Sequence, residues 1–95
     1  MRYELRIRPR ALSELRQILP DYTRLGLERS FLTELDLVFE TLRVMPRRFP
    51  PVAGPIHRAL LRRHPYAVFF RIRTEPVVVV LAVIHQRRDP ATWPR

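Results

Sequence analysis

Apolar and charged residues alternate along the first eight positions of the chain. Tyr3, Leu5 and Ile7 are interleaved with Arg2, Glu4, Arg6 and Arg8. This two-residue period predicts a strand with one buried face. Pro9 then ends the strand, and its fixed backbone suits the first turn of a helix.

A helical period begins after Pro9. Leu12, Leu15, Leu19 and Tyr22 recur at spacings of three, four and three residues, which places them on one face of a helix. Pro20 cannot donate a backbone hydrogen bond, so we expect this helix to kink or end near Leu19. Gly26 marks the turn that follows.

The second helix has the clearest pattern in the chain. Its apolar stripe consists of Leu27, Phe31, Leu35, Val38, Leu42 and Met45, the spacing of an amphipathic helix. Pro46 should end it. A short link between the two helices predicts an antiparallel helical hairpin. Residues 46–55 contain four prolines and one glycine, which indicates a connecting loop.

Three strand-like runs occupy residues 58–63, 66–72 and 77–84, and the turns between them are short, with one at Arg73 to Pro76. Short turns favour antiparallel pairing. The sequence therefore predicts an α+β fold of two layers in one domain over residues 1–95. An N-terminal strand, an antiparallel helical hairpin and three antiparallel strands would form one small twisted sheet under the helices.

The last strand is apolar on both faces. Val78, Val80, Ala82 and Ile84 leave the face away from the helices apolar, so something must cover it. One interpretation is that neighbouring strands and the C-terminal tail do so. The other is that a segment of a partner protein docks there.

The charge of the chain says more about its partner than the rest of its composition does. The chain has 18 basic residues, all of them arginine, and 9 acidic ones, which gives a net charge of +9 and an isoelectric point near 11.6. A charge of this size in 95 residues predicts an anionic partner, either nucleic acid or an acidic protein. The alternative is a cationic surface that serves only solubility.

Several classes of protein are disfavoured by what the sequence lacks. It has no cysteine, only two glycines and no serine nucleophile motif or metal-ligand spacing, so we expect no metal, no cofactor and no phosphate-binding glycine loop. The longest apolar run covers residues 77–84, far short of the roughly 20 residues that cross a membrane. The first residues do not form an apolar leader. We expect a cytoplasmic protein that has no membrane partner.

The residues that remain as candidates for chemistry are arginines and one histidine. The arginines cluster as Arg58, Arg62 and Arg63, then Arg71 and Arg73, then Arg87 and Arg88. Antiparallel strands would bring these clusters to one rim suited to phosphates or acidic groups, unless they serve only to keep a sheet edge from aggregating. His85 ends the last strand. It is either a general base beside Arg87 or Arg88, or a packing residue.

Four segments resemble a known family: ALSELRQILPDY, GLERSFLTEL, HRALLRRHPYAVFFRI and VVVVLAVIHQRRDPATW. Together they resemble the RelE/ParE superfamily of bacterial type II toxins, and its plasmid-stabilisation, ParE-like branch most of all, from Tyr3 to Trp93. The resemblance implies the same fold and a small antitoxin that wraps and neutralises the toxin. ParE-like members inhibit DNA gyrase, whereas RelE-like members cleave mRNA on the ribosome.

The residues argue for the first of these two activities. The basic and aromatic positions on which RelE-like enzymes rely fall on Arg58, Leu60, Ala67, Arg87 and Trp93. Only Arg58 and Arg87 keep the charge, and the indole of Trp93 cannot act as an acid or base near neutral pH. The resemblance therefore favours a gyrase inhibitor over a ribosome-dependent mRNA endonuclease. A degenerate toxin kept only as a binding partner is a third possibility.

The predicted sites follow from this interpretation. We expect Arg62, Arg63, His85, Arg87, Arg88 and Trp93 to bind the target, with His85 and Arg87 as the catalytic candidates if the protein is an enzyme. We expect the antitoxin to contact Arg58, Arg71, Val78 and Val80.

Overall fold

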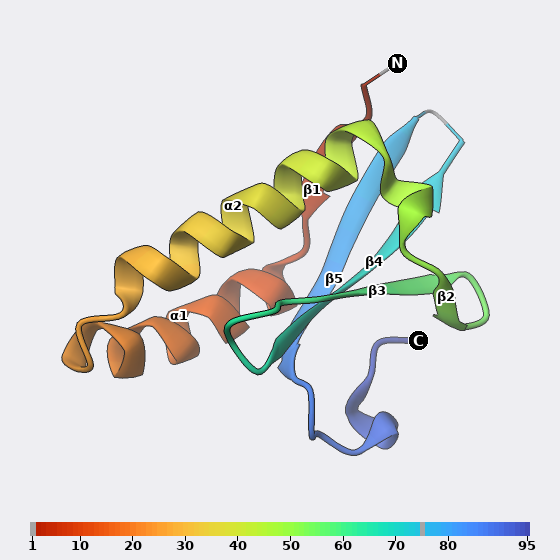
Figure 1. Ribbon diagram of the computed structural model, residues 1–95. Coiled ribbons are helices and arrows are strands. Elements are labelled where there is room, and N and C mark those ends of the chain that lie inside the picture. The colour runs from red at the N-terminus through yellow and green to blue at the C-terminus, as the bar shows by residue number, and fades with distance from the viewer. Residues whose placement is uncertain (1, 75) are drawn as a thin grey trace.

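Two helices lie against one face of a five-stranded sheet (Figure 1). The computed structural model describes residues 2–74 and 76–95. The elements are β1 (Glu4–Ile7), α1 (Pro9–Arg24), α2 (Glu28–Val44), the 3₁₀ turn η1 (Pro46–Arg48), β2 (Pro51–Ala53), β3 (Ile56–Leu60), β4 (Tyr66–Arg73), β5 (Val77–His85) and the 3₁₀ turn η2 (Pro90–Thr92). The predicted α+β fold is confirmed. Neither helix is long and apolar enough to cross a membrane within the described residues.

The sheet has the strand order β1-β5-β4-β3-β2. β1 pairs with β5 in parallel, with Glu4 opposite Val77, and the other three pairings are antiparallel. The short strand β2 lies within the proline-rich segment that the sequence predicts to be only a loop. Pro51 is tolerated there because β2 is an edge strand, where a missing N–H breaks no ladder.

The first helix continues past Pro20 and ends at Arg24, so it does not end near Leu19, which is one of the two outcomes that Pro20 predicts. Pro20 lies on the exposed side of the helix. The last turn is held by Tyr22, which is buried and stacks on Phe31 of α2 with ring centroids 4.6 Å apart. Packing of this kind outweighs the cost of a lost helical hydrogen bond.

The second helix presents most of its predicted stripe to the sheet. Phe31, Leu35 and Leu42 are buried, and Phe39 joins them although the predicted stripe omits it. Leu27 and Met45, the two ends of that stripe, are exposed, because they lie just outside the helical residues. Pro46 follows the helix end at Val44, as predicted.

The strands differ from the predicted ranges in one place that concerns the site. β3 ends at Leu60, so Arg62 and Arg63 lie in the turn before β4 and not on the strand. The turn predicted at residues 73–76 lies between β4 and β5, and its residue Glu75 lies outside the described residues.

A bulge in β5 decides which face each of its side chains occupies. Phe69 and Phe70 of β4 pair with Ala82 and Val80, which leaves Leu81 without a partner. Such an extra residue reverses the alternation of the strand. Val78 and Val80 therefore lie in the core under the helices, whereas Ala82 and Ile84 lie on the opposite face.

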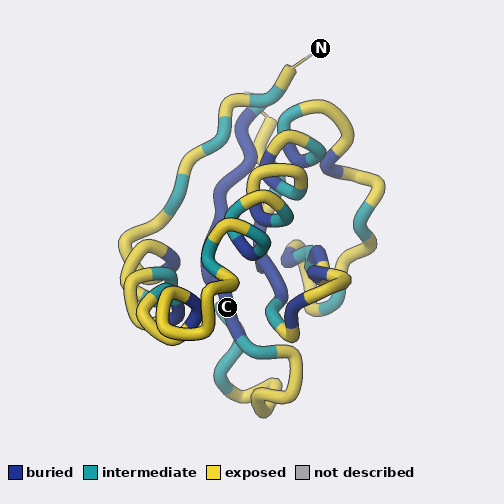
Figure 2. Tube along the Cα trace, turned by 60° about the vertical axis from the view of Figure 1, so that its left-hand side comes forward, coloured by how far each residue is buried: buried dark blue, intermediate teal, exposed yellow. Residues whose placement is uncertain are grey.

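Two cores result, one on each face of the sheet. The helix-side core contains Val78 and Val80, both fully buried. The tail-side core contains Ile56, Ala67, Phe69, Ala82 and Ile84, with Trp93 packed against it. Figure 2 shows the buried trace running through the central strands, with the helices exposed on their outer sides. A partner cannot reach Val78 or Val80 in this fold, which contradicts the prediction that they face the antitoxin.

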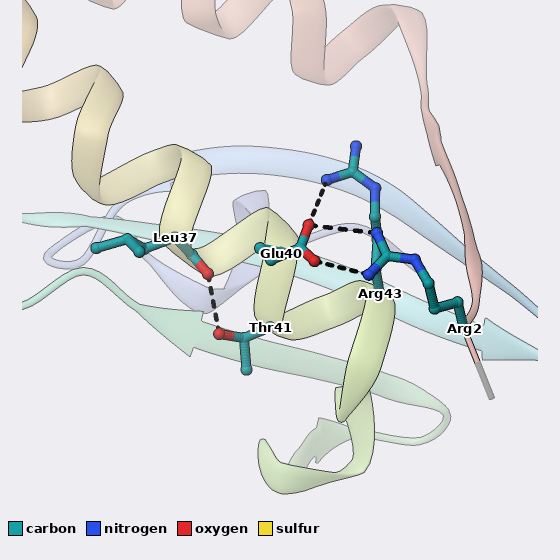
Figure 3. Close-up of polar contacts among 5 residues, drawn as sticks. All are labelled: Arg2, Leu37, Glu40, Thr41 and Arg43. Carbon is teal, nitrogen blue, oxygen red and sulfur yellow. Dashed lines mark hydrogen bonds and ion pairs between the residues drawn. The ribbon is translucent and has the colours of Figure 1, made fainter.

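The start of the chain is fastened to the end of α2 by polar contacts (Figure 3). Arg2 donates to the Glu40 carboxylate at 2.8 Å, and Arg43 donates to its second oxygen at 3.5 Å. The hydrogen bond from Arg2, with the charges of both arginines, lowers the pKa of Glu40. The backbone N–H of Tyr3 also donates to the carbonyl of Arg43 at 2.7 Å.

Candidate functional site

A hollow of about 460 Å³ lies where α1, the end of β5 and the C-terminal tail meet. We call it the strand-end pocket. Glu14 and Asp21 line it from α1, Tyr66 from β4, and His85 and Arg88 from the end of β5 and the following turn. The structure thus brings together two of the predicted target-binding residues, His85 and Arg88. Arg87 is exposed and does not line this pocket.

His85 is held from two sides. Its ring meets the ring of Tyr66 edge to face, with centroids 5.4 Å apart. Its Nδ1 lies 3.1 Å from the backbone nitrogen of Arg87, whose N–H donates to it. In the neutral imidazole one ring nitrogen accepts and the other carries the proton. This hydrogen bond therefore favours the tautomer with its proton on Nε2, which can donate a hydrogen bond.

Tyr66 is a polar group of this pocket that the sequence does not single out. Burial raises the pKa of its phenol, the charge of Asp21 raises it further, and Arg88 opposes both effects. The hydroxyl is therefore a neutral hydrogen-bond donor near neutral pH. The register could have revealed it, since Tyr66 pairs with His85 across the β4–β5 ladder.

Four arginines are exposed near this end of the sheet: Arg62, Arg63, Arg87 and Arg88. The side chain of Gln86 joins the two turns that carry them, because its Nε2 donates to the carbonyls of Leu61 and Tyr66 at 3.1 Å each. The first turn is also fixed to α2, since the Glu34 carboxylate accepts from the backbone N–H groups of Arg62 and Arg63 at 2.7 and 3.1 Å. Their guanidinium groups remain available to an anionic partner.

Trp93 lies away from these arginines, on the tail-side core. Its ring is 5.1 Å from that of Phe69, and the guanidinium carbon of Arg58 lies 5.2 Å from its centroid. Arg10 holds the same tail by donating to the carbonyl of Thr92 at 2.6 Å. The indole therefore anchors the tail over the second face of the sheet, as an amphipathic aromatic side chain can.

The predicted antitoxin contacts are divided between the two faces. Arg58 and Arg71 lie on the tail side of the sheet, where Arg58 covers Trp93 and Arg71 is exposed. Val78 and Val80 lie beneath the helices. No group of three or more metal-binding side chains occurs among the described residues.

Comparisons with known proteins agree with the fold and with the resemblance. Residues 5–90 match the family described as ParE toxin of type II toxin-antitoxin system, parDE. A solved structure, described as the chromosomal ParDE TA system from P. aeruginosa, superposes with a TM-score of 0.71 at 17% sequence identity. The match covers 87% of this chain and 95% of that chain. A search of the curated proteins finds no match.

Proposed function

Since this chain belongs to the ParE toxin family of type II toxin-antitoxin systems, we propose that it inhibits DNA gyrase and that a cognate antitoxin protein neutralises it. The observation that carries this choice over a nuclease is the hydrogen bond from the Arg87 backbone N–H to His85 Nδ1 at 3.1 Å. It occupies the Nδ1 lone pair and favours the neutral tautomer that carries its proton on Nε2. A general base needs a free lone pair within reach of the proton that it abstracts.

The residues on the tail side of the sheet support the same proposal. Ala67 and Trp93 occupy two positions where the resemblance to RelE-like ribonucleases calls for an arginine and a tyrosine. Ala67 is buried in the tail-side core, and Trp93 is packed on Phe69. Ala67 has no polar group, and the indole of Trp93 cannot transfer a proton near neutral pH. These residues serve packing, and the proposed activity is binding.

The surface proposed to contact gyrase is the end of the sheet that carries Arg62, Arg63, Arg87 and Arg88, with His85 and Tyr66 beside it. Gln86 and Glu34 fix the two turns by their hydrogen bonds, so the four cations are presented from a rigid base. Exposed arginines of this kind are common anchors in protein interfaces. Trp93 would contribute by fixing the tail and not by direct contact.

The proposed antitoxin surface includes Arg58, which is half-buried, and Arg71, which is exposed, but not Val78 or Val80. Arg58 and Arg71 lie beside the apolar tail-side core, and an antitoxin segment with acidic and apolar side chains would complement both. Because gyrase acts in the cytoplasm, we propose that compartment as the site of action.

Two assays on the purified full chain test the proposal. We expect inhibition of DNA supercoiling by gyrase and no cleavage of mRNA on translating ribosomes. Adding the antitoxin should restore supercoiling. Cleavage of mRNA with supercoiling unaffected would establish the ribonuclease instead, and inactivity in both assays would indicate a degenerate toxin.

A further inference from the structure

The charge of this molecule is unevenly divided between its helices and the rest of the chain. The helices α1 and α2 hold six of the nine acidic residues (Glu14, Asp21, Glu28, Glu34, Asp36 and Glu40) but only five of the 18 arginines. The strands β3, β4 and β5 contain three arginines and no acidic residue. The net charge of +9 therefore lies almost entirely on the strands, the turns and the tail.

Part of this charge lines a second hollow, which is separate from the surface proposed for gyrase. The hollow has a volume of about 420 Å³ and lies between the end of β1, the middle of the sheet and the tail. Arg8, Arg10, Arg71 and Arg95 line it, with Ile56 and Leu81 beneath them, and no acidic side chain takes part. We call it the arginine cleft.

Three of these four guanidinium groups have no hydrogen-bond or ion-pair partner among the described residues. Arg10 is held by Glu14 at 3.3 Å and by the carbonyl of Thr92 at 2.6 Å. The side chains of Arg8, Arg71 and Arg95 make no hydrogen bond or ion pair with any other described residue. Cations gathered without counter-charges repel one another, so an anion bound between them would be favoured.

The backbone fixes the spacing of Arg8 and Arg71. The N–H of Arg8 donates to the carbonyl of Val80, and Arg71 is the register partner of Val79. Arg8 follows Ile7, the register partner of Val80, so the two arginines flank β5 from either side and are offset by about two residues along it. Neighbouring strands lie about 4.8 Å apart, so their backbones are separated by roughly 10 Å. A separation of this size lets the two guanidinium groups contact different phosphates of one nucleic acid.

We propose that the arginine cleft binds the phosphate backbone of DNA. The planar fork of arginine suits phosphate oxygens, and the exposed rim of the cleft admits a long polymer. Contacts limited to the backbone position the nucleic acid without reading its sequence. The biological setting rests on the proposed function: a toxin bound to gyrase would lie beside the DNA that gyrase holds. An antitoxin that covers Arg71 would block this contact.

The test is fluorescence anisotropy of a short labelled DNA duplex, titrated with the purified full chain in the absence of gyrase and antitoxin. One phosphate contact each from Arg8, Arg71 and Arg95 predicts that log K falls with log salt with a slope of about −2.7 between about 50 and 200 mM salt. The variants Arg8→Gln and Arg71→Gln should each make the slope shallower by about 1. Arg16→Gln is the matched control, because Arg16 is exposed on α1 and does not line the cleft.

Two results would overturn the inference. In the first, Arg8→Gln and Arg71→Gln change the slope no more than Arg16→Gln does, although thermal unfolding shows that all three variants are folded. In the second, poly-glutamate of equal charge displaces the labelled duplex as readily as unlabelled duplex does. That result would assign the cleft to an acidic protein segment. A chain that binds DNA but leaves supercoiling intact would refute only the proposed function, so the two failures can be distinguished.

Discussion

The carboxylate of Glu14 on α1 accepts a hydrogen bond from the backbone N–H of Val83 on β5 at 2.9 Å. β1 pairs with β5 only as far as Val80, so the edge of β5 beyond that point has no neighbouring strand. Glu14 supplies an acceptor where a strand would have supplied a carbonyl. Its other oxygen pairs with Arg10, which in turn holds the tail at Thr92. One side chain thus connects the helix, the sheet and the tail.

Replacing Glu14 by alanine should therefore lower the free energy of unfolding by about 1–3 kcal/mol, because the Val83 N–H loses its partner. Glu14→Gln should cost less, since a carboxamide oxygen still accepts. Urea denaturation measures both changes, and Asp36→Ala, an exposed position on α2, serves as the control. Equal losses for the alanine and glutamine variants would show that the hydrogen bond contributes little.

Phe31 and Leu35 of α2 should be among the most sensitive core positions, since both are buried in the helix-side core. Truncating either to alanine should cost about 2–5 kcal/mol, a large share of the roughly 5–15 kcal/mol that stabilises a domain. The melting temperature reports the loss. Leu37→Ala is the comparison, because Leu37 is 65% exposed on the same helix, and a similar drop there would contradict the assignment of the buried face.

Changing Arg87 and Arg88 together to alanine should abolish growth inhibition without unfolding the protein. Both side chains are exposed, and exposed substitutions usually alter stability by less than about 0.5 kcal/mol. Growth of cells expressing the variant is measured together with its expression level and melting temperature. The double change of Arg16 and Arg29 to alanine, also at exposed positions, controls for net charge. Toxicity that persists in a folded, expressed variant would move the target surface elsewhere.

His85→Ala separates the two mechanisms. If His85 only contributes a contact, growth inhibition should weaken modestly, whereas a nuclease that used it as general base would lose about 10²–10⁴-fold in rate. The readout is the toxin concentration that half-inhibits supercoiling. A loss of activity as large as that of a catalytic base would refute the role that the hydrogen bond to Nδ1 indicates.

Stability should decline at alkaline pH because of two tyrosines. Burial raises the pKa of Tyr22 and of Tyr66 in the folded protein. Below the ordinary tyrosine pKa of about 10, the phenols are neutral in both states and stability does not depend on them. As pH rises above about 10, the unfolded chain ionises first and unfolding becomes easier. Urea midpoints measured across this range should fall less steeply in the Tyr22→Phe, Tyr66→Phe double variant, and an unchanged pH dependence would contradict the prediction.

The order of the elements was predictable from the sequence because it depends on local patterns. The spacing of Phe31, Leu35 and Leu42 indicates the buried face of α2. Tyr66, Val68, Phe70 and Ile72 alternate along the sequence and share one face of β4, which the structure shows to be the helix side. The bulge at Leu81 was not predictable, since no glycine or proline marks it. A regular alternation was assumed through Val78, Val80, Ala82 and Ile84, and one extra residue moved the first two to the opposite face.

The candidate site was predictable only where it lies at a strand end. The sequence predicts that His85 and Arg88 lie near each other, because His85 ends the last strand and Arg88 follows it closely. The same pocket also contains Tyr66, Glu14 and Asp21. Cross-strand register and helix packing bring these three residues there, and no local sequence pattern encodes either. Arg62 was placed on a strand that ends earlier, at Leu60, so its position depended on a boundary that the sequence does not mark.

The parallel pairing of β1 with β5 also has a consequence for how this protein is synthesised. Within the described residues β1 pairs with no strand but β5, and contacts so distant in sequence form slowly. During translation, β1 and both helices emerge while the centre of the sheet does not yet exist. A nascent chain that stops before Val77 has no strand against which β1 can pair. The complete fold is thus reached only after β5 has been synthesised.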